Sequence, residues 1–419
     1  MTMKSYTYIG PFTQILTFED LPLRGSLHDS FLKIVTNGGI LLEDHLIHSV
    51  GEHDQLLAQA IALNAEITTI EEPTIAMPGF IDAHTHICFS GSRASDYSLR
   101  NAGKTYLEIA KAGGGIWDTV THTRNTSELE LIEGIVQRAT QHSQHGSTTL
   151  EVKSGYGLTV EQELKMLNAI DKANKKLPID LISTCLAAHM LPKDFPGTAE
   201  EYLNEIASEL LPQIKEKGLS NRIDAFIEQG AFTKDTIAPY FEKASQLGFD
   251  ITVHADQFSV GGTQIAVQHN AISADHVEAS TDKEIALLAN SNVIAVALPG
   301  ATLGLGCDFA PARKLLNAGA SLAIASDHNP GSAPMGDLLS EAAILGAFEK
   351  LTNAEVLAGI TVRAAAALGL KDRGTLSQGY LADLVAFKTG DFREILYHQG
   401  SLKPCKVWKA GNLIYSASN

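Results

Sequence analysis

The chain has 419 residues, of which 44% are hydrophobic and 19% charged, and its formal net charge is −16 at pH 7. That length and composition suit a globular protein with one large and one smaller domain, and no apolar run approaches the roughly 20 residues that cross a bilayer. The acidic balance argues against nucleic-acid binding as the main role, whereas a local arginine can still hold an anionic substrate.

The two ends of the chain share one pattern. Residues 1–76 and residues 371–419 both contain short strand-like pieces with turn residues between them. Examples are Phe31-Leu-Lys-Ile-Val, Gly39-Ile-Leu-Leu, Asp383-Leu-Val-Ala-Phe and Lys406-Val-Trp-Lys. Because such pieces are too short to be stable separately, we expect both ends to combine in one small, composite β-sandwich domain.

Residues 77–370 repeat a different unit: a short apolar strand, a polar or glycine-rich loop, and an amphipathic helix. The strands are predicted to end near His86, Lys153, His189, Glu228, His254, His276, Pro299 and Asp327. Helix-like segments, with apolar residues three and four apart, cover residues 159–176, 199–217, 233–247, 308–319 and 335–350. Eight alternating units predict an α/β fold, a parallel (β/α)8 TIM-like barrel. The long first gap, with Gly113-Gly-Gly115, predicts an extended loop or lid.

The first barrel strand carries the most informative motif, Met77-Pro-Gly-Phe-Ile-Asp-Ala-His84-Thr-His86. An apolar run ends there in two histidines spaced i, i+2. In an extended strand this spacing places both imidazoles on one face. Two neutral imidazoles that converge from one strand end suit a divalent transition metal, zinc or iron.

Two further strand ends supply matching groups. His254 ends one strand and Asp327 ends the last, and the C-terminal strand ends of a (β/α)8 barrel carry its chemistry. We therefore predict one metal ion held by His84, His86, His254 and Asp327, with room for a water. Asp82 lies on the same face, two residues before the motif, and is interpreted as an orienting or packing residue and not as a ligand.

A second group of residues is predicted to face the substrate. His189 and His276 end strands, and Arg93 follows the H-x-H motif by one short loop, where its guanidinium suits a carboxylate. The other candidates lie in loops that can turn towards a ligand: Tyr156, Gln257, Asn329, Gly331 and Ser332. Each also has a purely structural interpretation, as a hydrogen-bonded strand end, a surface ion pair or a residue that shapes its loop.

A two-metal site bridged by a modified lysine is the rival metal scheme. Lys153 is the only lysine at one of the predicted strand ends, and it ends the second strand. The fourth strand ends in Glu228. One metal ion is therefore the preferred interpretation.

These motifs resemble the amidohydrolase superfamily and, within it, the imidazolonepropionase family. The resemblance covers nearly the whole chain and rests on Pro78-Gly-Phe-Ile-Asp-Ala-His-Thr-His, Ala112-Gly-Gly-Gly-Ile, Glu151-Val-Lys-Ser-Gly-Tyr-Gly, His254-Ala-Asp-Gln, Ser273-Ala-Asp-His and Asp327-His-Asn-Pro-Gly. It implies the same ligands and substrate contacts as above, with His276 near the reacting carbonyl. Two departures are visible. Leu381 replaces a proline, and His328 stands where many members have cysteine, which is expected to perturb the metal site or add a competing contact.

The resemblance further implies a reaction, the hydrolysis of the cyclic amide of 4-imidazolone-5-propanoate to N-formimidoyl-L-glutamate in histidine degradation. Asp327 would accept a proton from the attacking water and deliver it to the leaving ring nitrogen. His276 would stabilise the oxyanion. Arg93 and Tyr156 would hold the propanoate, while His189 and the Asn329 loop would orient the ring.

Two alternatives remain open. Another mononuclear amidohydrolase, such as a heterocycle deaminase, would use the same metal site without a propanoate clamp and would release ammonia. A non-catalytic barrel scaffold would typically have lost metal ligands, which this chain retains.

The remaining expectations concern environment and assembly. Four scattered cysteines, with no C-x-x-C pair, predict reduced thiols, and the N-terminus lacks the apolar segment of a signal peptide. We expect a cytoplasmic enzyme with a small-molecule substrate and with neither nucleic acid nor membrane as partner. A homodimer is the expected assembly, although no interface stripe is visible.

Overall fold

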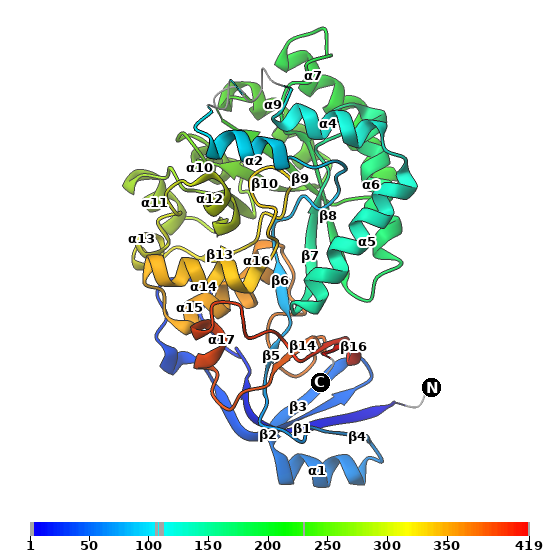
Figure 1. Ribbon diagram of the computed structural model, residues 1–419, viewed down its shortest axis with the longest axis vertical. Coiled ribbons are helices and arrows are strands. Elements are labelled where there is room, and N and C mark those ends of the chain that lie inside the picture. The colour runs from blue at the N-terminus through cyan, green and yellow to red at the C-terminus, as the bar shows by residue number, and fades with distance from the viewer. Residues whose placement is uncertain (1–3, 105–107, 109–112, 229–230, 418–419) are drawn as a thin grey trace.

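Two sheets organise the computed structural model, which describes residues 4–104, 108, 113–228 and 231–417. One is an eight-stranded parallel sheet and the other is an eight-stranded sheet built from both ends of the chain. Figure 1 shows the parallel sheet and its helices above, and the second sheet below, with both termini beside it. The predicted (β/α)8 barrel with a small β unit from both chain ends is confirmed. The exact domain limits, 1–76 with 371–419 and 77–370, stay a prediction.

The strands of the barrel lie side by side in the order of the sequence. They are β6 (Phe80–Asp82), β7 (Ser147–Lys153), β8 (Asp180–Ala188), β9 (Arg222–Ile227), β10 (Asp250–Ala255), β11 (Ser273–His276), β12 (Ile294–Ala297) and β13 (Leu322–Ile324). A parallel bridge between Thr85 and His328 joins the segments that follow the last and first strands. The H-x-H motif lies just beyond β6, on either side of the bridge residue Thr85, and not on the strand itself.

The helices of the barrel occupy the segments between its strands and those that follow β13. Their bounds are α2 (Ala94–Asn101), α4 (Ile116–Asn125), α5 (Glu128–Gln144), α6 (Val160–Asn174), α7 (Ala199–Glu205), a π-helical turn (Ile206–Leu210), α8 (Leu211–Glu216), α9 (Lys234–Gln246), α10 (Gly262–Gln268), α11 (Asp282–Ala289), α12 (Pro299–Leu305), α13 (Ala312–Asn317), α14 (Leu338–Glu349), α15 (Asn353–Gly359) and α16 (Val362–Ala367). The local sequence explains where several of these helices begin. Ser127 and Glu130 form a capping box at the start of α5, and Thr281 and Glu284 form one at the start of α11. All five predicted helical segments contain helix.

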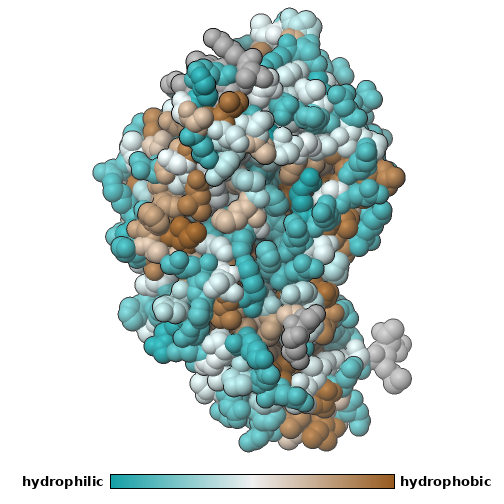
Figure 2. Space-filling view, in the orientation of Figure 1, coloured by the Kyte–Doolittle hydropathy of each residue, from teal (hydrophilic) through white to brown (hydrophobic). Residues whose placement is uncertain are grey.

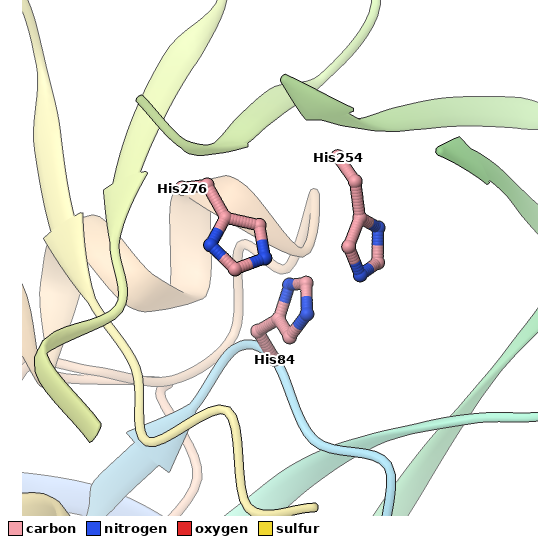
Figure 3. A group of neighbouring side chains, drawn as sticks. All are labelled: His84, His254 and His276. Atoms are coloured by element: carbon pink, nitrogen blue, oxygen red, sulfur yellow. The ribbon is translucent and has the colours of Figure 1, made fainter. Parts of the chain in front are cut away.

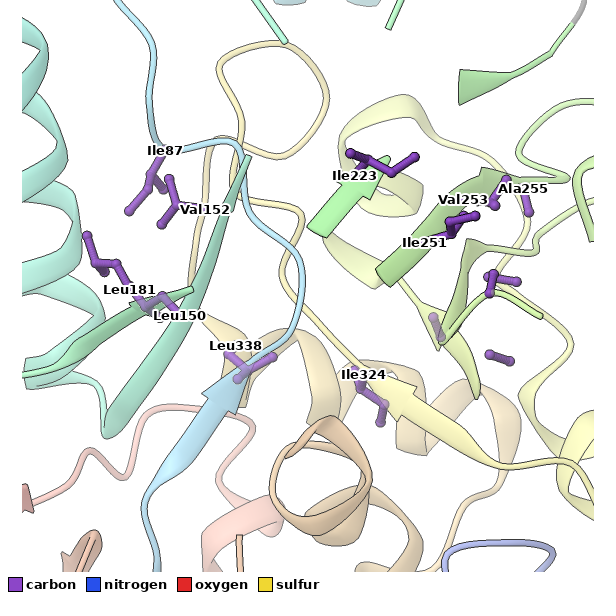
Figure 4. Packing of buried hydrophobic residues seen from close by; sticks show 14 of the residues in the cluster. Ile87, Leu150, Val152, Leu181, Ile223, Ile251, Val253, Ala255, Ile324 and Leu338 are labelled. Carbon is purple, nitrogen blue, oxygen red and sulfur yellow. The ribbon is translucent and has the colours of Figure 1, made fainter. Parts of the chain in front are cut away.

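Alternation along the strands separates an apolar layer from a polar interior. Leu150 and Val152 of β7 lie in the hydrophobic core with Ile251 and Val253 of β10, as Figure 4 shows. Successive side chains of a strand point to opposite faces of the sheet. Glu151 and Lys153 of β7, and Thr252 and His254 of β10, therefore point into the barrel. All four are buried. The sequence therefore builds a barrel whose inside is ionic near the C-terminal strand ends.

The sheet from the chain ends is mostly antiparallel. Its strands are β1 (Tyr6–Leu16), β2 (Ile34–Glu43), β3 (Leu46–Glu52), β4 (Glu66–Thr69), β5 (Ile75–Pro78), β14 (Leu384–Phe387), β15 (Lys406–Lys409) and β16 (Asn412–Ser416), accompanied by α1 (His53–Ala62) and α17 (Arg393–Tyr397). The strand predicted from Phe31 is wrong at its start: Asp29–Phe31 is a 3-10 turn. Asp29 accepts from Ala354 N at 2.9 Å, which ties this turn to α15 instead of a strand.

Hydrophilic residues cover most of the face seen in Figure 2, with separate brown patches between them. Within the described part of the chain, no helix combines the length and the apolar character needed to cross a membrane.

Candidate metal centre and pocket

Three imidazoles and one carboxylate converge at the C-terminal mouth of the barrel. The Nε2 atom of His86 lies 3.2 Å from Nε2 of His84 and 3.3 Å from Nε2 of His254. Oδ1 of Asp327 lies 3.5 Å from His84 Nε2 and 3.4 Å from His86 Nε2. The side chains come from three different places in the barrel and are all buried. Within the described residues, His84, His86 and Asp327 meet as one group of possible metal ligands, and His254 joins this cluster beside His86.

The spacing and chemistry of this cluster fit a metal ion. Ligands about 2.0–2.2 Å from a tetrahedral ion lie roughly 3.3–3.6 Å from one another, which is close to the four separations given above. Oδ1 of Asp327 is buried and has no hydrogen-bond partner among the described residues. Burial lowers the pKa of His84 and His86 well below the usual value and that of His254 to about 3. Neutral imidazole is the form that binds metals.

Two carboxylates behind the cluster orient its histidines. Asp275 Oδ2 lies 2.6 Å from His84 Nδ1, and Asp224 Oδ2 lies 2.8 Å from His254 Nδ1. Such carboxylates fix the tautomer and ring direction of metal-ligating histidines. Neither carboxylate was among the predicted site residues. Their signal was a charged residue at an inward position of an otherwise apolar strand.

Lys153 lies below these carboxylates as a buried cation. Its Nζ is 2.7 Å from Glu151 Oε1 and 2.8 Å from Asp224 Oδ2. Although burial alone lowers the pKa of Lys153, the carboxylates of Asp224, Glu151 and Asp275 raise it above its ordinary value. An ammonium held in this way is not available as a modified, metal-bridging lysine, which argues for the one-metal scheme.

His276 stands beside the cluster in an unusual backbone conformation. Its φ is 86°, in the left-handed region that non-glycine residues rarely adopt. Figure 3 shows its ring beside those of His84 and His254. These three histidines form one possible metal-ligand group and His84, His86 and Asp327 form another, each with ligand atoms within 4.8 Å of one another. Burial opposes protonation of His276, but nearby Glu278, 3.4 Å from Nδ1, raises its pKa.

One cavity of about 560 Å³ opens onto this cluster. It is lined by every residue predicted to contact substrate and by three of the predicted ligands: Arg93, Tyr156, His189, Gln257, His276, Asn329, Gly331 and Ser332, with His86, His254 and Asp327. The fourth ligand, His84, lies behind them and is fully buried.

Arg93 and Tyr156, the residues predicted to bind a carboxylate, both line this cavity. Arg93 precedes α2, and its Nε donates to Asp96 Oδ2 at 2.8 Å, which leaves its terminal nitrogens for a ligand. Burial raises the pKa of Tyr156 above its ordinary value, so the phenol is a hydrogen-bond donor. The ring of His189 lies 5.6 Å from that of Tyr156 and 5.7 Å from that of His86, and the rings of Tyr156 and His86 lie 6.0 Å apart.

Asn329 holds the loop that presents Asp327. Its amide nitrogen donates to Asp327 O at 2.7 Å and Oδ2 at 2.9 Å. Its amide oxygen accepts from the backbone N–H groups of Gly331 and Ser332, both at 2.8 Å. Asp327 is thereby fixed in the left-handed region, with φ 54°, and burial raises its pKa to about 7. Asn329 borders the cavity while its amide is engaged within the loop.

His328 forms a buried pair with His142, outside the metal cluster. Its Nδ1 lies 2.9 Å from Nε2 of His142 on α5. Burial lowers the pKa of His328 to about 4, so the ring is neutral. Asp82 lies behind this pair and accepts two hydrogen bonds from Ser326, through N at 3.0 Å and Oγ at 2.5 Å. Within the described residues, neither His328 nor Asp82 belongs to a metal-ligand group.

Comparison with known proteins places the chain in a family. The amidohydrolase family model matches residues 75–414. The imidazolonepropionase of Acinetobacter baumannii (strain AB307-0294) is 39% identical over 384 residues, which are 90% of this chain and 94% of the relative. The imidazolonepropionase of Bacillus cereus (strain ATCC 10987 / NRS 248) is 38% identical over 408 residues, 96% and 95% of the two chains.

Solved structures with the same fold are more distant in sequence. A zinc-bound adenosine deaminase from Xanthomonas campestris has a TM-score of 0.72 at 18% identity, covering 98% of this chain and 93% of that one. An ochratoxinase from A. niger has a TM-score of 0.70 at 15% identity, covering 99% and 96%. At these identities the likeness shows the fold alone.

Proposed function

This chain belongs to the amidohydrolase family, and from that premise we propose how its pocket performs the imidazolonepropionase reaction. The protein is a hydrolase of a carbon–nitrogen bond, as its imidazolonepropionase relatives of 38–39% identity are. The substrate that we propose is 4-imidazolone-5-propanoate, and the product is N-formimidoyl-L-glutamate. One observation supports this choice. A single cavity is lined both by residues of the proposed metal cluster and by the guanidinium of Arg93, which suits the carboxylate of the substrate.

We propose a single divalent transition metal, zinc or iron, held by His84, His86, His254 and Asp327. When bound, such an ion lowers the pKa of water from about 15.7 to about 7 and polarises a carbonyl. Asp327 accepts the proton of the attacking water and later returns it to the leaving ring nitrogen.

The other pocket residues bind and orient. His276 donates to the carbonyl oxygen as negative charge develops there, because Glu278 favours its protonated ring. Arg93 and Tyr156 bind the propanoate, and His189 holds the ring. The Nδ1 atom of His189 lies 2.9 Å from Gly155 O, so Nδ1–H donates to this carbonyl and Nε2 is left as an acceptor. Fixed groups of this kind align the reacting atoms before reaction.

The metal and the reaction are tested together in one experiment. Freshly prepared 4-imidazolone-5-propanoate should be opened by the purified protein with about one equivalent of zinc or iron per chain. Chelator-treated protein should lose at least roughly 99% of this rate and regain it on addition of metal, since the ion activates water. The measurement is loss of imidazolone absorbance, with metal content determined by mass spectrometry on the same sample.

The same assay separates the alternatives. Release of ammonia without ring opening would support a heterocycle deaminase. A protein that binds no metal and turns over neither class of substrate would support the scaffold interpretation. A homodimer remains a prediction, which light scattering of the purified protein checks.

A further inference from the structure

One buried lysine connects the two carboxylates that orient the metal-ligating histidines. Lys153 Nζ lies 2.8 Å from Asp224 Oδ2 and 3.8 Å from Asp275 Oδ2. Those same oxygens face His254 Nδ1 at 2.8 Å and His84 Nδ1 at 2.6 Å. The ammonium of Lys153 is therefore linked, through Asp224 and Asp275, to the two proposed ligands His254 and His84, which are far apart in the sequence.

The charges around this ammonium explain why it is needed. Asp224, Asp275 and Glu151 are 0–1% exposed, and Lys153 is fully buried among them. Like charges so close together repel strongly in a dry interior, and a buried carboxylate without a partner is costly. Without Lys153 the three carboxylates would separate or rearrange, and the two histidines would lose their fixed acceptors.

We propose that Lys153 is a positioning residue that sets metal affinity through Asp224 and Asp275. The inference rests on the proposed metal site but not on the identity of the substrate. Among the described residues its ammonium contacts carboxylates and none of the four ligand atoms. Disturbing the outer partners of metal ligands typically weakens metal binding about 10- to 100-fold.

Zinc titration of the metal-free protein tests this role. Lys153→Met is expected to raise the Kd for Zn²⁺, measured in competition with a chromophoric chelator, by about 10- to 100-fold. Lys409→Met is the matched control. Lys409 is also buried, on β15 of the sheet from the chain ends, and its Nζ lies 2.7 Å from a carboxylate oxygen of both Asp383 and Asp180. It should lower Tm but leave the Kd within about threefold, as expected for a distant site.

The outcomes are distinct. Zinc binding by Lys153→Met that is as tight as wild type, or tighter, would mean that the lysine only neutralises charge, and the proposal would fail. If Lys153→Met does not fold, Lys153→Arg keeps the charge but changes the head group, and it should also bind zinc more weakly. Wild-type affinity in Lys153→Arg would then overturn the positioning role. Absence of zinc binding in the wild type would contradict the metal site itself.

A second, independent observation concerns the carboxylate end of the pocket, where two guanidinium groups flank Gly331. A Cβ placed on Gly331 would lie 2.2 Å from Nη1 of Arg93. Nη2 of Arg100 lies 3.5 Å from the carbonyl oxygen of Gly331. Arg93 immediately precedes α2 and Arg100 lies two turns later, so both reach the same side of the helix. Both line the cavity.

The two arginines differ in their partners. Arg93 is paired with Asp96, whereas Arg100 has no carboxylate within ion-pair distance in the described part of the chain. A cation of this kind at the mouth of a cavity creates a local positive potential in a chain of net charge −16. We infer that Arg100 is a second carboxylate-recognition residue, which deepens the proposed function by adding to the propanoate site.

Binding of two non-reacting ligands tests this assignment. Imidazole-4-propanoate carries the ring and the charged chain without the cyclic amide, and imidazole-4-propanamide carries the same chain uncharged. By calorimetry, Arg100→Gln should weaken propanoate binding about tenfold, equivalent to about 1.4 kcal/mol, and leave the propanamide unchanged. Arg393→Gln removes the same charge from an exposed helix, where Arg393 pairs with Asp391, and should change neither affinity.

Each result decides between two readings. Equal weakening of both ligands, or of neither, would overturn the carboxylate role, because a residue that only supports the Gly331 loop does not sense the charge of the chain. If the wild type fails to prefer the propanoate, the proposed substrate is wrong. If it does prefer the propanoate and Arg100→Gln keeps the whole preference, only the role of Arg100 is wrong.

Discussion

Asp327→Asn is expected to lower kcat at least about 1,000-fold with little change in fold, because the amide can neither accept the proton of water nor return it to the leaving nitrogen. The substitution keeps the size of the side chain, and the loop around it is held by Asn329. The measurement is ring opening under single-turnover and steady-state conditions. Metal content must be determined in parallel, because Oδ1 of Asp327 is also a proposed ligand.

Asp256→Asn provides the matched control for this prediction. Asp256 is buried, has φ 53°, and follows a barrel strand as Asp327 does. Its carboxylate accepts from Gly261 N at 2.9 Å and Thr263 N at 3.2 Å, so its role is to hold a loop. We expect Asp256→Asn to lose stability but to keep kcat within about tenfold, the effect of one hydrogen bond. An Asp327→Asn protein that retains metal and near-normal kcat would remove Asp327 from the chemistry.

Arg93→Gln is expected to lower kcat/KM about 100- to 1,000-fold, because loss of one partner of a buried, hydrogen-bonded charge pair costs about 2–5 kcal/mol. The Arg93 side chain is 11% exposed, so water compensates only partly for the lost guanidinium. Arg93→Lys should recover part of the loss, since it restores the charge but not the planar fork. The measurement is kcat/KM for the propanoate substrate.

The charge of the substrate chain is the control for this second prediction. The Arg93→Gln protein should bind imidazole-4-propanamide as well as the wild type does, because this ligand has no carboxylate for a guanidinium to hold. Wild-type kcat/KM on the carboxylate-bearing substrate would show that Arg93 is not the clamp. Equal loss for charged and uncharged ligands would indicate a role in holding α2 through Asp96.

Periodicity was sufficient to predict the barrel. Short apolar runs alternate with segments whose apolar positions are three or four apart, so strand ends near His86, Lys153, His254 and Asp327 could be predicted without the structure. The start of β2 could not. Phe31-Leu-Lys-Ile-Val reads as a strand locally, but contacts of Asp29 with α15 make its beginning a turn. Contacts more than 300 residues apart are not visible in a local pattern.

The predicted metal ligands and pocket residues could be named from sequence because they follow strands. In a parallel barrel all C-terminal strand ends meet at one mouth, which predicts the histidines and Asp327 there. The loop residues and Arg93 were assigned to the substrate by the resemblance to the imidazolonepropionase family. What each loop residue does there depends on its neighbours. Asn329 borders the cavity as predicted, yet its amide is occupied by the loop that presents Asp327.

The sequence by itself determined the architecture, the H-x-H motif with its distant partners and the chemical class of the site, because these depend on periodicity and residue type. The tertiary structure alone decided which charges face one another. In the folded protein the carboxylate of Asp275 contacts His84 and that of Asp224 contacts His254. The ammonium of Lys153 lies near both carboxylates. Such pairs arise from the register of neighbouring strands and from side-chain direction, which a linear sequence does not encode locally.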